Sequence, residues 1–362
     1  MLTEYLQDNL NPYQAKSEVQ KLTFYPIMFQ AARVVLKTGI LKETYNHRRS
    51  GISPAEIAQK LNLPHYGVKT LLEVGLSIGL FFLKEEDKYA ISKMGYFLLN
   101  DKATLVNLNF THDVCYNAMY HLEESILEEK PIGLKEIGLE EFSTIYPGLA
   151  LLKEPIKTSW FDFDHYYSDN AYPAALEMVF SNNPTHIVDI GGNTGKWSIA
   201  CCKYNSKVKM TIVDLPGQLN MANKAIRENN FQNRISTQYS DVLGTNFEVP
   251  KDASIVWMSQ FLDCFSEDQI VKILTNVYSS IDDTTEVFIL ELFWDRQKDF
   301  AAAYSLHATS LYFSAIANGN SKMYHSKDLF KLIDRAGFEV VSDSDLVGDF
   351  HTLLKCKKRR SN

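Results

Sequence analysis

The chain has 362 residues, of which 45% are hydrophobic and 22% are charged, and its formal net charge at pH 7 is −7. This length and composition indicate a folded globular protein of two or three domains and exclude a collagen-like, low-complexity or disordered chain. The acidic balance gives no general attraction to phosphate polymers, so we do not expect nucleic acid as a partner.

The sequence shows no sign of a membrane span, a secretory signal or a metal centre. The most apolar window, Leu71–Leu83, contains Glu73 and is shorter than the ~18 apolar residues that a membrane span requires. Residues 1–20 have no basic start followed by an apolar stretch. The five cysteines show no Cys-x-x-Cys spacing, which favours free thiols over disulfides or zinc. We therefore expect a cytoplasmic, metal-independent protein with no membrane partner.

A long helix is expected first along the chain. Residues 17–41 carry apolar side chains at helical spacing, and Gly39 stands near the expected end. Large apolar residues in this stretch, such as Phe24, Tyr25 and Phe29, suit a dimer interface as well as a core.

The next segment has the pattern of a winged helix. Ser53 is expected to cap a helix that starts at Pro54, and His65–Leu80 is expected to form the following helix. Phe81–Leu83 and Tyr89–Ile91 flank a charged turn, which predicts a β-hairpin.

A winged helix can bind DNA, but the charges here favour another use. Residues 1–100 hold 12 Lys or Arg against 9 Asp or Glu, and the second helix of the pair is mostly aliphatic. We expect internal packing or a protein interface, and retain as an alternative a non-enzymatic regulator that senses a nucleoside metabolite.

After a helical, aromatic-rich stretch from Thr104 to Asn170, short apolar strands alternate with amphipathic helices. This alternation predicts a parallel sheet covered by helices, with the last two strands pairing antiparallel at one edge around Gly348. The expected strands are Thr185–Ile190, Lys207–Val213, Ile235–Ser240, Ala253–Ser259, Glu286–Leu292, Glu339–Asp343 and Phe350–Lys357.

The first of these strands runs into a glycine-rich turn that opens a helix, a place where open α/β sheets bind ligands. Its glycines at 191, 192 and 195 do not match the G-x-G-x-x-G spacing of dinucleotide sites. Asp189 precedes the turn and suits a ligand that carries an ammonium in place of a phosphate. The amino acid end of S-adenosylmethionine fits that description.

Two further acids end the next strands. Asp214 lies about 20 residues beyond the glycines, where a carboxylate can bind ribose hydroxyls, and Asp241 stands where it can accept a hydrogen bond from an adenine amine. Each acid alone is a weak signal, but acids at three successive strand ends favour a single nucleoside site.

These motifs together resemble the caffeic acid O-methyltransferase type of S-adenosylmethionine-dependent methyltransferase, which includes plant phenol-methylating enzymes and bacterial natural-product relatives. Val188–Gly195 resembles the family's glycine motif, Asp214–Pro216 its ribose site, Ser240–Val242 its adenine site and Trp257–Leu274 its catalytic segment. The resemblance extends over nearly the full length.

The resemblance implies an α/β fold with a doubly wound, Rossmann-like C-terminal sheet and a mostly helical, winged-helix N-terminal domain that forms a homodimer. The implied division is a dimerisation domain at 1–103, connecting helices that contribute to the substrate pocket at 104–170, and a cofactor domain at 171–362. The implied S-adenosylmethionine contacts are Asp189, Gly191, Gly192, Asn193, Gly195, Asp214, Leu215, Asp241 and Val242.

The sequence departs from the family in its catalytic residues. Asp263 stands where the family has its histidine base; Glu291 matches one of the two glutamates that orient the base, and the second falls near Met323 and is missing. Asn193 replaces the third glycine of the loop, and asparagine tolerates left-handed backbone better than most residues.

An aspartate base must overcome a pKa gap, because a phenol has a pKa of ~10 and an unperturbed Asp ~3.9, a difference of roughly 8 kcal/mol. Burial beside Phe261 and Phe265, with Glu291 nearby, is expected to raise the pKa of Asp263 by ~3 units and halve this penalty. Alternatively, Asp263 only positions the acceptor and another group, such as His112, His165 or His307, takes the proton.

The expected reaction is methylation of the hydroxyl of a small phenolic acceptor, in secondary metabolism, and ring C-methylation stays open because a phenolate is nucleophilic at both atoms. The acceptor's identity, and whether it is free or carrier-bound, are open. Flat aromatic acceptors suit the aromatic side chains of the pocket helices. The candidate pocket residues are His112, Trp160, Phe163, His165, His307 and Tyr312.

Overall fold

The computed structural model describes residues 5–244 and 247–359, which form two compact units. One unit is Gln7–Thr111; the other runs from His112 onward and includes Tyr5 and Leu6. Most of the stretch expected to connect two domains, residues 112–170, therefore belongs to the same unit as the sheet.

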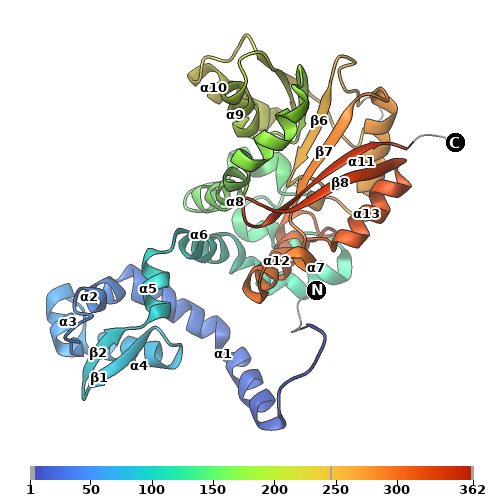
Figure 1. Cartoon of the computed structure of the whole chain (residues 1–362). Helices are drawn as coiled ribbons and strands as arrows, with labels where there is room; N and C mark the ends of the chain where they lie inside the picture. Colours follow the sequence, from blue (N-terminus) through green and yellow to red (C-terminus); the bar gives the residue numbers. More distant parts are fainter. Residues whose placement is uncertain (1–4, 245–246, 360–362) are drawn as a thin grey trace. The chain divides into compact units, whose positions relative to one another are not determined.

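The N-terminal unit is a set of helices with one hairpin (Figure 1). Ser53 begins the expected helix through a capping box, in which its side chain accepts the N–H of Glu56 and the Glu56 carboxylate accepts the N–H of Ser53. The hairpin pairs β1 with β2 antiparallel, so the winged-helix pattern is confirmed. The elements are α1 (Pro12–Lys37), α2 (Ile40–Asn46), α3 (Pro54–Leu61), α4 (His65–Ser77), β1 (Phe81–Glu85), β2 (Lys88–Ile91), α5 (Lys93–Asn100) and α6 (Lys102–Phe110).

The first expected helix is two helices. Asn11 caps α1, so it begins earlier than residue 17, and it ends at Lys37. Gly39 takes a φ of +84°, a left-handed conformation that breaks the helix, and α2 then starts at Ile40.

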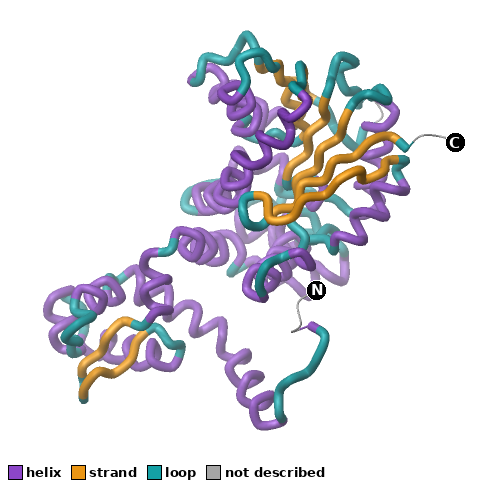
Figure 2. Tube along the Cα trace, viewed as in Figure 1, coloured by secondary structure: helices purple, strands orange, loops and turns teal. Residues whose placement is uncertain are grey.

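The second unit is built on a seven-stranded sheet in the order β5-β4-β3-β6-β7-β9-β8, shown in orange in Figure 2. Strands β3 to β7 pair parallel, whereas β9 pairs antiparallel with both β7 and β8, as predicted for the edge. The strands are β3 (His186–Ile190), β4 (Lys209–Asp214), β5 (Ile235–Tyr239), β6 (Ile255–Ser259), β7 (Glu286–Glu291), β8 (Phe338–Val347) and β9 (His351–Lys358).

Helices cover both faces of this sheet, so the predicted doubly wound fold is confirmed (Figure 1). Residues of α8, α9 and α10 pack with Trp257 and Ile212 on one face, and residues of α11 and α13 pack with Val256 and Met258 on the other. The helices are α7 (Leu122–Glu128), α8 (Ile156–Val179), α9 (Lys196–Tyr204), α10 (Pro216–Glu228), α11 (Glu267–Ser280), α12 (Phe300–Tyr312) and α13 (Ser326–Arg335). Among the described helices, none has the length and apolar content to span a membrane.

The turn between β8 and β9 offers a test of this packing. Gly348 has a φ of +59°, and a Cβ there would lie 2.4 Å from the Cα of Ala171 in α8. We expect Gly348→Ala to lower the free energy of unfolding by about 2–5 kcal/mol, since left-handed strain and a backbone clash add. Gly138→Ala is the matched control, because Gly138 has a φ of +75° but no atom near its would-be Cβ. Urea unfolding measures both, and equal losses would contradict the packing described.

Candidate functional site at the carboxyl edge of the sheet

The loop that follows β3 has an unusual backbone. Gly191, Asn193 and Gly195 all have positive φ angles, of +74°, +48° and +78°. Asn193 therefore adopts the left-handed geometry that the sequence anticipated for it. A Cβ on Gly191 would lie 2.2 Å from the ring of Phe261, in the turn after β6, so this position also requires glycine for space.

Asp189 lies beneath this loop. Its side chain is buried, it accepts a hydrogen bond from the Ser198 hydroxyl at 2.7 Å, and a Cβ on Gly192 would lie 2.7 Å from the same oxygen, Oδ2. Burial raises the pKa of Asp189 to about 7. Its role in holding the methionine part of a ligand stays a prediction.

Asp214 joins the tip of β4 to the loop. Its carboxylate accepts the backbone N–H of Asn193 at 2.8 Å and that of Leu215 at 2.7 Å. Burial raises its pKa to about 6. The structure thus brings Asp214, Leu215 and the glycine loop together, and the β4–β5 pairing sets the next strand tip beside them.

Asp241 follows β5 and is exposed. It accepts the N–H of Leu243 at 2.9 Å, while the carbonyl of Val242 accepts a hydrogen bond from the Asn276 amide at 3.1 Å. The order of strands β5-β4-β3-β6 therefore arranges Asp241, Asp214, the loop and the turn after β6 in sequence along one edge.

Helix α8 contacts the loop through three side chains, two of which the sequence did not single out. The Asn193 amide donates to Asp164 at 3.2 Å, the Thr194 hydroxyl lies 3.3 Å from His165 Nε2, and Lys196 forms an ion pair with Asp169 at 2.8 Å. Asp164 and Asp169 lie in an aromatic-rich helix. Only their contacts with Asn193 and Lys196 distinguish them from acids that face solvent on a helix surface.

Burial moves the pKa of two of these groups in opposite directions. It raises the pKa of Asp164 to about 6 and lowers that of His165 to about 4. His165 is consequently a neutral imidazole at pH 7.

The turn after β6 carries Asp263 on a backbone held by Glu291. One Glu291 oxygen accepts the N–H of Phe261 at 3.1 Å and that of Leu262 at 2.8 Å. Asp263 is 5% exposed, and the Cys264 thiol lies 3.5 Å from its Oδ1. Glu291 thus orients the turn through its backbone, an arrangement that the sequence did not reveal.

Burial is the main cause of the perturbed pKa values at this turn. It raises the pKa of Asp263 to about 7, with a further increase from the charge of Asp164. Burial and the charge of Asp263 raise the pKa of Glu291 well above its ordinary value. The expected shift of Asp263 is therefore present, and its causes include an acid on α8.

A side-chain contact between Gln260 and His351 also holds the turn after β6. Gln260 has a φ of +46°, and its side-chain oxygen lies 3.1 Å from Nε2 of His351, which is fully buried at the start of β9. No local pattern predicts this contact, because its partners are 91 positions apart.

Several of the expected pocket residues meet near these acids. The indole N–H of Trp160 donates to the Tyr312 hydroxyl at 2.7 Å, and Phe163 packs on Tyr167 with ring centroids 5.3 Å apart. Burial raises the pKa of Tyr312 well above its ordinary value, and the negative charge of Asp164 adds to this increase. Trp160 and Tyr312 therefore form one polar-tipped aromatic pair within electrostatic reach of Asp164.

The other two histidines have different surroundings. His112 Nδ1 lies 2.7 Å from Asp113, which accepts a hydrogen bond from Ser159 on α8. His307 packs edge-on against Tyr5 and at a tilt against Trp294, at ring-centroid distances of 5.6 and 4.9 Å.

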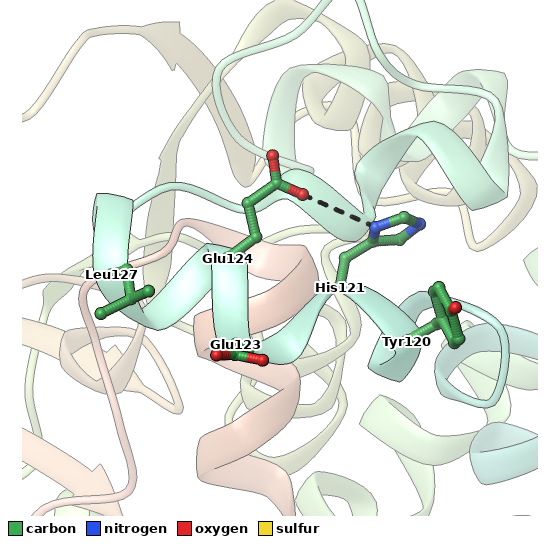
Figure 3. Close-up of a pocket in the computed structure, with 5 residues that line it drawn as sticks. All are labelled: Tyr120, His121, Glu123, Glu124 and Leu127. Atoms are coloured by element: carbon green, nitrogen blue, oxygen red, sulfur yellow. Dashed lines mark ion pairs between the residues drawn. The ribbon is translucent and has the colours of Figure 1, made fainter.

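A surface hollow of about 340 Å³ lies elsewhere, lined by Tyr120, His121, Glu123, Glu124 and Leu127 (Figure 3). His121 pairs there with Glu124 at 3.8 Å. None of its lining residues belongs to the strand-tip site. Within residues 5–244 and 247–359, no group of three or more His, Cys, Asp or Glu side chains is placed to hold a metal ion.

Two family models match the chain. The Dimerisation2-like domain matches residues 16–89, and the O-methyltransferase domain matches residues 172–339. An L-tyrosine C(3)-methyltransferase of Streptomyces lavendulae is 19% identical over 296 residues, covering 80% of this chain and 78% of the relative.

Solved structures share the fold. The S-adenosylmethionine-dependent methyltransferase SibL superposes with a TM-score of 0.72 at 20% identity, covering 95% of this chain and 99% of that one. NcsB1, an O-methyltransferase from neocarzinostatin biosynthesis in complex with S-adenosylmethionine and 2-hydroxy-5-methyl naphthoic acid, has a TM-score of 0.66 at 17% identity, covering 91% of this chain and 96% of that one.

The buried Asp263 carboxyl predicts a pH-dependent stability. In the folded state Asp263 keeps its proton up to about pH 7, whereas in the unfolded state it loses the proton near pH 3.8. The contribution of this carboxyl to the free energy of unfolding is therefore full below pH 3.8 and is lost as the pH rises to 7. We expect the wild type to lose about 2–3 kcal/mol of unfolding free energy relative to Asp263→Asn between pH 5 and pH 8. Urea titrations at both pH values measure this. Asp268→Asn, at a side chain that is 93% exposed, serves as control and should follow the wild type; a parallel pH profile for Asp263→Asn would refute the assignment.

Proposed function

We propose, on the premise that this chain belongs to the O-methyltransferase family through its Dimerisation2-like and O-methyltransferase domains, that it transfers a methyl group from S-adenosylmethionine to the hydroxyl of a small aromatic acceptor. Asp263 is the proposed base and Glu291 the residue that positions it. The proposed assembly is a cytoplasmic homodimer, with residues 1–103 as the dimerisation domain, 104–170 as pocket helices and 171–362 as the cofactor domain.

The observation that carries this proposal is the contact between Phe261 and Gly191. Phe261 stands two residues before Asp263, and its ring occupies the space that a side chain at 191 would fill. The loop expected to bind the cofactor and the turn that bears the proposed base therefore pack directly against each other. Methyl transfer requires donor and acceptor sites in such proximity.

The residues present fit S-adenosylmethionine. The glycines let the loop turn with left-handed backbone at 191 and 195 while it packs on Phe261 and Asp189, and Asn193 Oδ1 is a buried acceptor with no hydrogen-bond partner among the described residues. We assign the ribose hydroxyls to Asp214 and Leu215, the adenine to Asp241 and Val242, and the methionine part to the loop, with Asp189 supporting Gly191, Gly192, Asn193 and Gly195 from below.

The cofactor, when bound, supplies a methyl group already activated on a sulfonium. What remains for the chain is to orient the acceptor, exclude water and accept its proton. With the pKa of Asp263 at about 7, the gap to a phenol near 10 is about 3 units, or roughly 4 kcal/mol. Glu291 fixes the turn by its two backbone hydrogen bonds, so the carboxylate is held in one place for proton transfer.

An aromatic acceptor suits the side chains around this acid. Trp160 and Tyr312 present a flat surface with a fixed hydrogen-bond direction, and Phe163 and His165 extend it along α8. We assign the outer boundary of the pocket to His112 and His307.

Ring C-methylation is the second candidate function. It is favoured by the similarity to an L-tyrosine C(3)-methyltransferase over 80% of this chain. The same base can form a phenolate for either reaction, and the pocket geometry then selects oxygen or the ortho carbon. Proton NMR of the product distinguishes a methyl ether from a ring methyl.

Exposed apolar residues of α1 support the homodimer. They lie on a helix that falls within the Dimerisation2-like match and stay accessible in the single chain. They are Val19, Leu22, Phe24, Tyr25 and Ile27.

Asp263→Asn tests the proposed base. The wild type is first given isotope-labelled S-adenosylmethionine with simple phenols and naphthols to find an accepted substrate. We then expect the variant to lose 10²–10⁴-fold in kcat, the usual contribution of a general base, while its Kd for S-adenosylhomocysteine changes less than about threefold. Asp268→Asn should leave both constants unchanged. Full turnover in Asp263→Asn would exclude this residue as the base, and failure of the folded wild type to bind S-adenosylhomocysteine in calorimetry would exclude the proposed function.

A further inference from the structure

We infer that Asp164 of α8, together with the side-chain oxygen of Asn193, forms the binding site for the α-ammonium of the cofactor's methionine part. This inference rests on the proposed function and adds a residue that neither the sequence motifs nor the matched domain assigns, since Asp164 lies outside residues 172–339.

The first step is the accessibility of the acids around the loop. Asp189 is 2% exposed, is bonded to Ser198 and lies under Gly192. Asp214 has each of its oxygens on a backbone N–H. The Asp164 side chain, by contrast, is 28% exposed and lies against the loop from the side of α8. With Asp214 assigned to the ribose, Asp164 is the carboxylate on the α8 side of the loop that a ligand can reach.

The second step is the position of Asp164 along the edge of the sheet. It is hydrogen-bonded to Asn193 of the loop at 3.2 Å, and its negative charge acts on both Asp263 and Tyr312. Since the ribose end lies toward Asp214 and the acceptor end toward Asp263, Asp164 stands between them. The amino acid part of the cofactor extends from the same sulfur that must face the acceptor, so it belongs in this interval.

The third step is the chemistry of the two oxygens. Asn193 uses its amide N–H to donate to Asp164, and its Oδ1 is buried with no hydrogen-bond partner among the described residues. An ammonium has three donors and a positive charge, so it can donate to the accessible Asp164 carboxylate, and it reaches Asn193 Oδ1 when the side chain turns outward. Two acceptors with one negative charge match an ammonium and would repel the ligand's carboxylate.

Lys196 has another acid as its ion-pair partner. Its ammonium lies 2.8 Å from Asp169, further along α8, and its charge also lowers the pKa of Asp164. The raised pKa of Asp164, about 6, still leaves it mostly ionised at pH 7.5, where a bound cation stabilises the charged form further.

Three nucleoside ligands distinguish binding of the ammonium from binding of the rest of the cofactor. S-adenosylhomocysteine has both the ammonium and the carboxylate, S-adenosyl-3-thiopropylamine has only the ammonium, and 5′-methylthioadenosine has neither. Calorimetry with the full-length protein at pH 7.5 should show Asp164→Asn binding the two amines about 10–100-fold more weakly than the wild type, and 5′-methylthioadenosine with an unchanged Kd. Asp162→Asn, at an exposed position of the same helix, should bind all three as the wild type does.

The outcomes discriminate between the inference and its premise. Equal affinity of wild type and Asp164→Asn for the two amines would overturn the inference, and so would an equal loss for all three ligands, which indicates a structural role. Should the variant not fold, the wild type alone decides, because it must bind S-adenosyl-3-thiopropylamine at least about tenfold more tightly than 5′-methylthioadenosine. A folded wild type that binds none of the three overturns the proposed function itself.

Discussion

The close packing of Phe261 on Gly191 is the constraint on which the rest of the site depends. Strands β3 and β6 are parallel neighbours, so the loop after one and the turn after the other must share the same edge of the sheet. Space for the ring exists only because residue 191 has no side chain. Glu291, on the next strand, holds the backbone of Phe261 and Leu262, and Phe261 in turn limits how the glycine loop can move. Three adjacent strand tips are therefore joined by direct contacts.

The same edge gathers carboxyl groups at a cost in stability. Burial raises the pKa of Asp164, Asp189, Asp214 and Asp263. The ionised form of each acid is therefore less stable in the protein than in water. A protein selected for stability alone would replace several of them with apolar or amide side chains. Their retention is understandable if a positively charged ligand binds among them, because a sulfonium and an ammonium lower the energy of the ionised carboxylates. Acids with raised pKa values that cluster at one edge of a sheet are a common feature of functional sites.

Local patterns in the sequence were sufficient to predict the helices, the strands and the loop at the carboxyl edge of the sheet. They were insufficient to predict the contacts between elements. The capping box at Ser53, the alternation of apolar strands and the glycine loop are all encoded by neighbouring residues, and the structure has them. Gly39 was placed at the end of one helix, yet its left-handed backbone divides two. Asp164 escaped notice because its significance comes from Asn193, a partner 29 positions away, and the same holds for His351 and Gln260. Helical periodicity identifies which residues share a face but gives no information on what that face meets.

The proposal that Asp263 acts as the base in place of a histidine has a consequence for the acceptor. The aspartate side chain is shorter than that of histidine. The acceptor hydroxyl must therefore approach the backbone of the turn more closely. Asp263 is buried beside Cys264, and Tyr146 lies close enough for the Asp263 charge to raise its pKa. Because Asp263 is only 5% exposed, an unhindered O–H is favoured. Because the pKa of Asp263, the proposed base, is about 7, acidic phenols would lose less free energy on proton transfer to it than simple ones. Both the shape and the acidity of the acceptor are consequently limited by one side chain.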